Sequence, residues 1–183
     1  MTELKNSLTD QQACLDFFQS RSTLMLSTFN SQGTLETSVA PFVTDNEGHF
    51  YLFVSELARH TQNILEWITV NEAASLNPDS VKRPGLVSCL LVADEIETKQ
   101  LFARERLTMQ LELAEVLRAS SHFEWIMTRF ESKFGEIITL LKSLPDFHLI
   151  QLTPVTGGYV KGFGQAFTFK GFPGQQLQPI QQK

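Results

Sequence analysis

The sequence predicts a mainly β (α+β) fold in which six or seven antiparallel strands form a β-barrel with covering helices. Runs of β-branched and apolar residues alternate with turn residues, and most connections are short enough for hairpins. Helical periodicity appears only near the start, in the middle and near the end. With 183 residues, 42% of them hydrophobic, the chain can bury one core. We expect one domain over residues 1–170 and a disordered tail, rich in Gln, Pro and Gly, at 171–183.

The first half of the chain has the pattern of a helix, two linked hairpins and a second helix. Thr9 and Gln12 form a capping-box signature, which predicts a short N-terminal helix. Turn residues then separate three extended runs. These runs predict strands at 22–29, 35–43 and 49–54, and apolar periodicity predicts a helix from Ser55.

The second half begins after an interrupted stretch. Periodicity fails from 67 to 85, which contains two Pro-centred breakers and is expected to form an extended loop or insertion outside the core; a partly helical conformation is the alternative. The nearly all-apolar run at 86–93 predicts a strand buried on both faces. A charged helix is expected at 94–104 and a strand at 106–117. A capping box at Ser121 and Glu124 then predicts the start of two helices, with a hinge between them at Gly135. Paired strands are expected at 147–152 and 159–169.

Composition excludes several classes of protein. Fifteen Lys and Arg against 20 Asp and Glu give a net charge of -5, so we expect neither nucleic acid nor a membrane as partner. The longest apolar run is far below the roughly 20 residues of a membrane helix, and the first residues lack the apolar core of a signal peptide, which predicts a cytoplasmic protein. Cys14 and Cys89 have apolar neighbours and are expected to be buried, reduced thiols.

Familiar catalytic motifs are missing from the sequence. There is no Gly-x-Ser-x-Gly elbow, and the four histidines lack the close spacing of zinc motifs, so no metal site is predicted. Gly162-Phe163-Gly164 lacks the third glycine and the crossover helix of a dinucleotide fingerprint. These glycines more simply allow close approach of strand backbones.

Three positively charged segments remain as candidates. Arg59, His60 and Thr61 follow a predicted helix start, where unpaired backbone N–H groups favour an anion; the alternative is an ordinary amphipathic helix. Lys161 either contacts an anionic ligand or is solvated at a strand end. Arg104 lies in a cationic cluster whose alternative is a surface ion-pair helix.

Several segments in combination resemble a known family. They are Ser38–Val43 with Leu57–Asn63, Ala93–Thr108, Phe134–Ile138, Asp146-Phe147 and Val160–Ala166. Together they span most of the chain from Ser22 to Phe169, and in this order they resemble the haem-utilisation proteins of the FMN-binding split-barrel superfamily, which includes pyridoxamine phosphate oxidases. The resemblance implies a homodimer of split β-barrels with ligand grooves at the subunit interface.

The resemblance also implies roles for particular residues. In the superfamily the flavin phosphate is held where Arg59, His60 and Thr61 fall, with Ser38 on a neighbouring strand. In the haem-handling branch, the positions of His60, Arg104 and Asp146 are associated with the haem site, and Arg59 or Lys161 is expected to pair with haem propionates. Arg104 and Asp146 are the candidate catalytic residues.

One departure from the family concerns the iron ligand. Haem-degrading members carry an iron-ligating histidine beyond the last strand, whereas this sequence has no histidine after Phe169. Three functions therefore stay open: a haem-binding protein that opens the ring oxidatively as a haem oxygenase does, an FMN-dependent oxidoreductase, and a dimer that binds haem or flavin without turnover.

Overall fold

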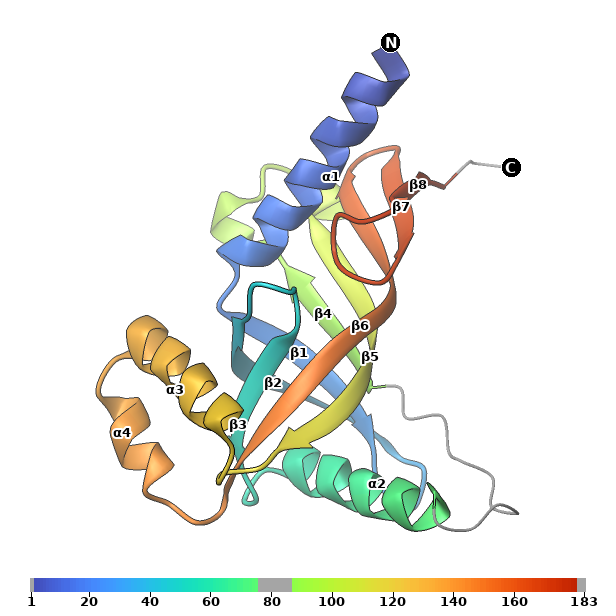
Figure 1. Cartoon of the computed structure of the whole chain (residues 1–183). Helices are drawn as coiled ribbons and strands as arrows, with labels where there is room; N and C mark the ends of the chain where they lie inside the picture. Colours follow the sequence, from blue (N-terminus) through green and yellow to red (C-terminus); the bar gives the residue numbers. More distant parts are fainter. Residues whose placement is uncertain (1, 76–86, 181–183) are drawn as a thin grey trace.

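The computed structural model describes residues 2–75 and 87–180, which form a β-barrel with helices at both ends and one side (Figure 1). Its elements in chain order are α1 (Thr2–Ser20), β1 (Thr23–Phe29), β2 (Leu35–Thr44), β3 (Phe50–Ser55), α2 (Arg59–Ser75), β4 (Val87–Val92), the short 3-10 helices η1 (Glu95–Glu97) and η2 (Leu101–Ala103), β5 (Arg106–Val116), α3 (Ser121–Phe134), α4 (Ile137–Lys142), β6 (Phe147–Gly162), β7 (Gln165–Lys170) and β8 (Gln178–Pro179).

Six strands close the barrel. They follow the order β3-β2-β1-β4-β5-β6, and pairing of β3 with β6 joins the two edges, while β7 and β8 extend the sheet beyond β6. All these pairings are antiparallel. The predicted mainly β fold, an antiparallel split barrel with covering helices, is confirmed. Closure leaves no free edge among the six barrel strands, which removes the unpaired N–H and C=O groups of an open sheet.

The barrel has a closed interior and a second apolar layer outside it. Alternate residues of the strands point inward, and α1 covers one mouth with Cys14, Phe17 and Phe18. Outside the wall, α3 packs Phe123, Ile126, Met127 and Phe130 against the outer side of β3. Burial raises the pKa of the Cys89 thiol, so this cysteine stays protonated, as expected.

The helices differ from the sequence predictions at their ends. α1 begins at Thr2, so Thr9 lies inside the helix and the predicted cap there is wrong. α3 is capped one residue earlier than predicted, because the Ser120 hydroxyl accepts a hydrogen bond from the N–H of Phe123 at 3.1 Å. The predicted hinge is confirmed: Gly135, with a φ of 79°, separates α3 from α4.

The interrupted stretch is helical in its first part, which is the alternative that the sequence left open. α2 extends through Ser75, so residues 67–75 are helical, and the rest of the predicted loop lies outside the described residues. β4 is not buried on both faces: Val87, Cys89 and Leu91 point inward while Ser88 is exposed. The predicted charged helix at 94–104 is instead a loop with the two 3-10 helices.

The last strands also differ from the prediction. Residues 147–162 form one continuous strand, β6, and the Gly162-Phe163-Gly164 segment makes the turn into β7. Residues 171–180, predicted to be disordered, are folded onto the molecule: Leu177 is buried, and the Phe172 ring meets that of His49 with centroids 5.3 Å apart. Burial of Leu177 stabilises the folded position of this segment; the overall polar composition of the segment gave no sign of this.

The length of β6 sets the distance between the two ends of the molecule. Asp146 precedes this strand at the end covered by α2, called the α2 end, and Lys161 lies near its other limit, called the α1 end (Figure 1). Sixteen residues of β-strand span about 50 Å if straight.

None of the described helices is long and apolar enough to cross a membrane.

Candidate functional site

A groove lies where α2 begins, against the first half of β2. It has a volume of about 540 Å³ and is lined by Glu36, Thr37, Ser38, Ala58, Arg59 and His60. Because side chains alternate along a strand, Glu36 and Ser38 lie on the same face of β2. Ala58 directly precedes α2, and Arg59 and His60 are the first residues of that helix. The groove therefore joins two segments that the sequence analysis linked only by family resemblance.

The charges in the groove are paired. Arg59 Nη1 donates to Glu36 Oε1 at 3.2 Å, and Asn63 Nδ2 donates to Glu36 Oε2 at 3.0 Å and to Thr28 Oγ1 at 2.9 Å. The hydrogen bond from Asn63, followed by the contacts with Arg59, lowers the pKa of Glu36, so this carboxylate is ionised at neutral pH. The guanidinium stays accessible, since 80% of the Arg59 side chain is exposed.

His60 and Ser38 contribute unpaired polar atoms beside this pair. Within the described residues, His60 Nε2 and Ser38 Oγ are buried and have no hydrogen-bond partner. Desolvation by burial lowers the pKa of His60, so its imidazole is neutral near pH 7. Buried polar atoms normally find partners, so two such atoms at one groove indicate a place where a ligand or water can satisfy them.

Thr61 does not line this groove. Its side chain is completely buried, and its hydroxyl has no hydrogen-bond partner among the residues that the structure describes. It lies one turn before the buried Ile64, on the face of α2 that is turned toward the barrel. Of the three adjacent residues proposed to hold an anion, only Arg59 and His60 are placed to meet a ligand in this conformation.

Asp146 lies at the α2 end of the barrel, close to the start of α2. Its Oδ2 accepts a hydrogen bond from Ser55 Oγ at 2.6 Å, and its carbonyl oxygen accepts one from the N–H of Glu56 at 2.9 Å. These two hydrogen bonds brace the turn that leads into α2, whose first residues are Arg59 and His60.

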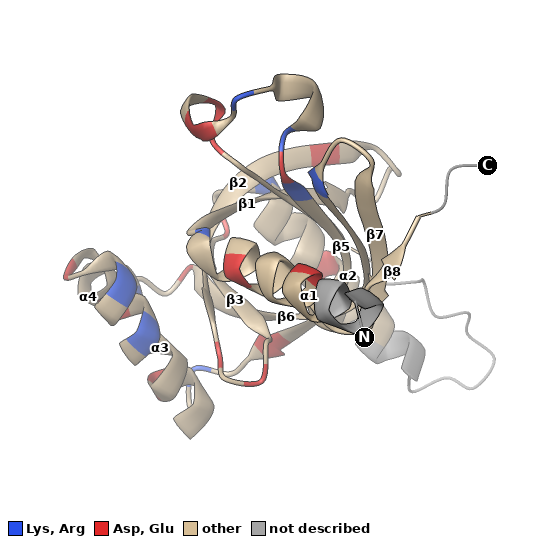
Figure 2. Ribbon diagram, turned by 90° about the horizontal axis from the view of Figure 1, so that it is seen from above, with Lys and Arg blue, Asp and Glu red and all other residues tan. Residues whose placement is uncertain are grey.

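Arg104 and Lys161 lie at the α1 end instead. Arg104 donates to the carbonyl oxygen of Ala93 and, through Nη1, to Glu95 Oε1 at 3.2 Å. Lys161 Nζ donates to Asp10 Oδ1 at 3.0 Å. The view from above shows acidic and basic residues alternating along the loop that carries η1 and η2 (Figure 2). Within one chain, this charged loop and the groove are at opposite ends of the barrel.

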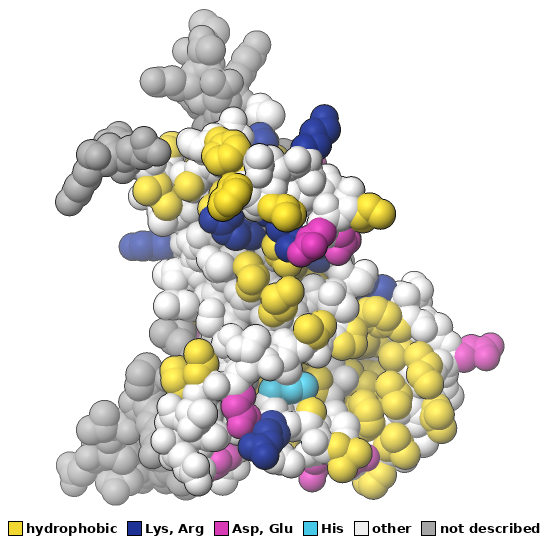
Figure 3. All heavy atoms as spheres, turned by 180° about the vertical axis from the view of Figure 1, so that it is seen from behind, with side chains coloured by type: hydrophobic (Ala, Val, Ile, Leu, Met, Phe, Trp, Pro, Cys, Tyr) yellow, Lys and Arg dark blue, Asp and Glu magenta, His cyan; other side chains and the backbone are white. Residues whose placement is uncertain are grey.

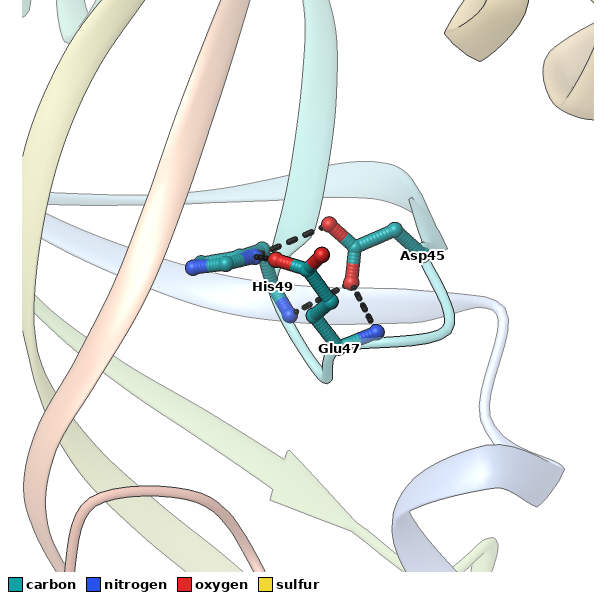
Figure 4. A group of neighbouring side chains, drawn as sticks. All are labelled: Asp45, Glu47 and His49. Atoms are coloured by element: carbon teal, nitrogen blue, oxygen red, sulfur yellow. Dashed lines mark hydrogen bonds and ion pairs between the residues drawn. The ribbon is translucent and has the colours of Figure 1, made fainter.

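A cluster of potential metal ligands lies at the tip of the β2–β3 hairpin, away from the groove. Asp45, Glu47 and His49 place ligand atoms within 4.8 Å of one another (Figure 4). Asp45 already accepts hydrogen bonds from the backbone N–H groups of Glu47 and His49, from His49 Nδ1 at 2.9 Å and from the Tyr51 hydroxyl at 2.9 Å. These bonds explain the cluster as the brace of a turn.

Glu36 is the groove residue that sequence reasoning missed. A carboxylate on a predicted strand gives no sign of its partners, which come from a helix more than twenty residues later. The available signal was its spacing: Glu36 stands two residues before Ser38, so both had to share a face of the strand.

The chain is similar to haem-handling proteins of known sequence and structure. It is 40% identical over 156 residues to a protein of Vibrio cholerae named heme oxygenase HutZ. The aligned residues cover 85% of this chain and 78% of that protein. Among solved structures, it matches HutZ from Vibrio cholerae, described as a heme storage protein, with a TM-score of 0.66, 31% identity and coverage of 88% and 94% of the two chains. It matches Campylobacter jejuni ChuZ with a TM-score of 0.74 and 26% identity, covering 98% of this chain but 63% of that one.

More distant matches establish the fold alone. A pyridoxinephosphate oxidase family protein from Clostridium acetobutylicum has a TM-score of 0.60 at 13% identity, with coverage of 89% and 95% of the two chains. No family model matches the chain. The identity and coverage of the Vibrio cholerae relative place the chain in the HutZ family of haem-utilisation proteins.

Proposed function

We propose that this protein binds haem in the groove between β2 and α2, at the seam of a homodimer, and serves in haem utilisation. One observation carries the proposal: the exposed guanidinium of Arg59 lies in the same groove as two buried polar atoms that have no hydrogen-bond partner, His60 Nε2 and Ser38 Oγ. Family membership supplies the class of ligand, because the Vibrio cholerae relatives are named for heme oxygenation and heme storage.

The groove residues fit the polar groups of haem. Arg59 has five N–H donors, and Glu36 engages only Nη1, so other donors are left for a propionate. The neutral ring of His60 and the hydroxyl of Ser38 fit the less charged rim of the macrocycle or a water between it and the protein. Haem supplies the iron chemistry when bound, and these residues orient it.

The homodimer is supported by the distance between the groove and the other candidate residues. Arg104 and Lys161 cannot approach His60 within one chain, because β6 holds the two ends of the barrel apart. A second copy could bring its α1 end to the groove of the first.

Exposed apolar side chains provide a surface on which a second copy can pack. On the outer side of the barrel near the groove, Phe29, Leu35 and Val39 are each more than half exposed. The back view shows further hydrophobic side chains gathered over α3 and α4 (Figure 3). Scattered exposed hydrophobics are normal on a monomer, whereas a broad apolar face next to a ligand groove is typical of a subunit interface.

Haem titration of the purified protein tests the proposal. The wild type should give a saturable shift of the Soret band, and light scattering should give the mass of a dimer. His60→Ala and Arg59→Ala should each weaken haem binding by about tenfold or more, as expected for the loss of one strong polar contact. The matched control is Lys170→Ala, which removes an exposed positive charge from β7 away from the groove and from the η1–η2 loop, and which should bind as the wild type does.

Two further readouts decide the class of protein. Loss of the Soret band after addition of a reductant under air supports ring opening, and a stable spectrum supports binding or storage. A spectrum equal to that of free haem, or equal affinities for the His60 variant and its control, would overturn haem binding in this groove. A monomer at all concentrations and with haem present would overturn the dimer.

A further inference from the structure

The start of α2 has the features of a phosphate site. A helix N-terminus presents unpaired backbone N–H groups and the positive end of the helix dipole, and an arginine beside it adds a fork of donors. α2 has 17 residues, and Arg59 is the first of them. A compact phosphate ester would be expected to bind here if nothing else occupied these donors.

The chain supplies its own anion at this place. Glu36 projects from β2 to Arg59 and Asn63, with donor–acceptor distances of 3.2 and 3.0 Å. Asn63 is buried and is itself fixed by its bond to Thr28, so the Glu36 carboxylate is held from two sides. Only 21% of the Glu36 side chain is exposed, which limits its freedom to swing away.

We propose that Glu36 is a specificity-determining residue that makes the groove reject phosphate monoesters. Its fixed carboxylate occupies the side of Arg59 that a phosphate would take, and its charge repels a dianion at close range. A ligand whose carboxylates are singly charged and carried on flexible arms can reach the exposed side of Arg59 instead. The inference rests on the proposed function for the identity of the accepted ligand, while the rejection of phosphate is a property of the chain alone.

The two forms of one flavin isolate the effect of the phosphate. Riboflavin and FMN share the ring system and the ribityl chain, and only FMN carries a phosphate. The readout is the dissociation constant of riboflavin divided by that of FMN, obtained from the quenching of flavin fluorescence. In the wild type this ratio should be at or below about one, because the phosphate gains nothing from the groove.

Removing the charge of Glu36 should reverse this preference. In Glu36→Gln the ratio should rise at least tenfold, and in the double variant Glu36→Gln, Arg59→Ala it should return to the wild-type value, because the freed guanidinium is lost again. Glu112→Gln, which removes an exposed carboxylate from β5, is the matched control and should leave the ratio unchanged. If Glu36→Gln does not fold, Glu36→Thr removes the same charge with a residue that strands favour.

The outcomes separate this inference from haem binding. An equal ratio in the wild type and in both Glu36 variants, a rise in the Glu112 control, or no measurable FMN binding by the Glu36 variants overturns the role of Glu36. Haem titration of the same proteins is an independent measurement. Failure of the wild type to bind haem, with the expected flavin ratios, overturns the proposed function and leaves the rejection of phosphate intact.

Discussion

The ammonium group of Lys133 donates a hydrogen bond to the carbonyl oxygen of Phe42 at 3.0 Å and lies 4.8 Å from the centre of the Phe42 ring. A second bond runs from Lys133 Nζ to the carbonyl oxygen of Arg21 at 3.1 Å. The side chain stands in the last turn of α3 and contacts both the end of β2 and the segment before β1. One lysine thus ties the outer helix layer to the barrel.

Replacing this lysine should loosen the helix layer. Lys133→Met keeps the apolar stem but removes both hydrogen bonds and the cation over the ring, and should lower the free energy of unfolding by about 1–2 kcal/mol. Urea denaturation followed by circular dichroism measures the change. Lys99→Met, an exposed lysine on the η1–η2 loop, is the control, and an equal loss in both variants would contradict the role of Lys133.

Stability should depend on pH through His148. Burial opposes protonation of this ring, but hydrogen bonds to Glu115 and Glu56, at 2.6 and 2.7 Å, outweigh it and raise the pKa of His148. The stability that His148 contributes is therefore fully present below the unfolded pKa of about 6.5 and is lost as the pH rises through the higher pKa of the folded state. Unfolding free energies measured from pH 5.5 to 8.5 should fall across this window.

Variants identify the source of that pH dependence. His148→Gln should flatten the curve in this window, and Glu56→Gln, which removes one of the two charges facing the ring, should flatten it in part. The idea fails if the wild type and His148→Gln lose stability in parallel as the pH is raised.

The polar contact beneath the groove should matter for stability as well. Asn63→Ala leaves the buried Thr28 hydroxyl without its donor and frees Glu36 from one of its two restraints. We expect a loss of about 1–3 kcal/mol in the free energy of unfolding, and a pKa of Glu36 that returns toward its usual value. Thermal unfolding and NMR titration of the carboxylate measure these changes. Gln62→Ala, at the neighbouring position of α2, serves for comparison; a pKa of Glu36 unaffected by Asn63→Ala would argue against this contact.

The C-terminal segment should contribute to folding despite its polar composition. Leu177 is 9% exposed and packs into the barrel core, so Leu177→Ala should cost about 2 kcal/mol. Ile180→Ala removes a side chain that is 54% exposed and should change the unfolding midpoint little. Similar midpoints for the two variants would show that the segment is not part of the core.

The sequence predicted the strands better than the ends of the helices. Alternating apolar residues bounded by turn residues were sufficient to locate β1, β2, β3 and β5, because these signals are local. The start of α1 was missed and the continuation of α2 past Trp67 was predicted only as an alternative, since packing and helix cooperativity there outweigh weak periodicity. The burial of Leu177 depends on α1 and β7, which no local pattern reveals.

The candidate site was predicted in part for the same reason. Arg59 and His60 were proposed because they are adjacent and stand at a helix start, and Ser38 was proposed through family resemblance; all three line the groove. Glu36 was missed because its role depends on Asn63 and Arg59, which reach it only through the tertiary fold. Sequence spacing also does not show the length and register of β6, which place Arg104 and Lys161 far from His60 within one chain.

The close approach of Gly174 to α1 constrains the order in which the chain folds. A β-carbon at this glycine would lie 2.8 Å from the carbonyl oxygen of Gln11, so an early helix and a late turn are in direct contact. During synthesis α1 is made long before this turn, so the contact between them can form only after residue 174 has been translated. The complete packing of α1 therefore depends on the C-terminal segment, and a chain that stops before residue 174 lacks part of the contact surface of this helix.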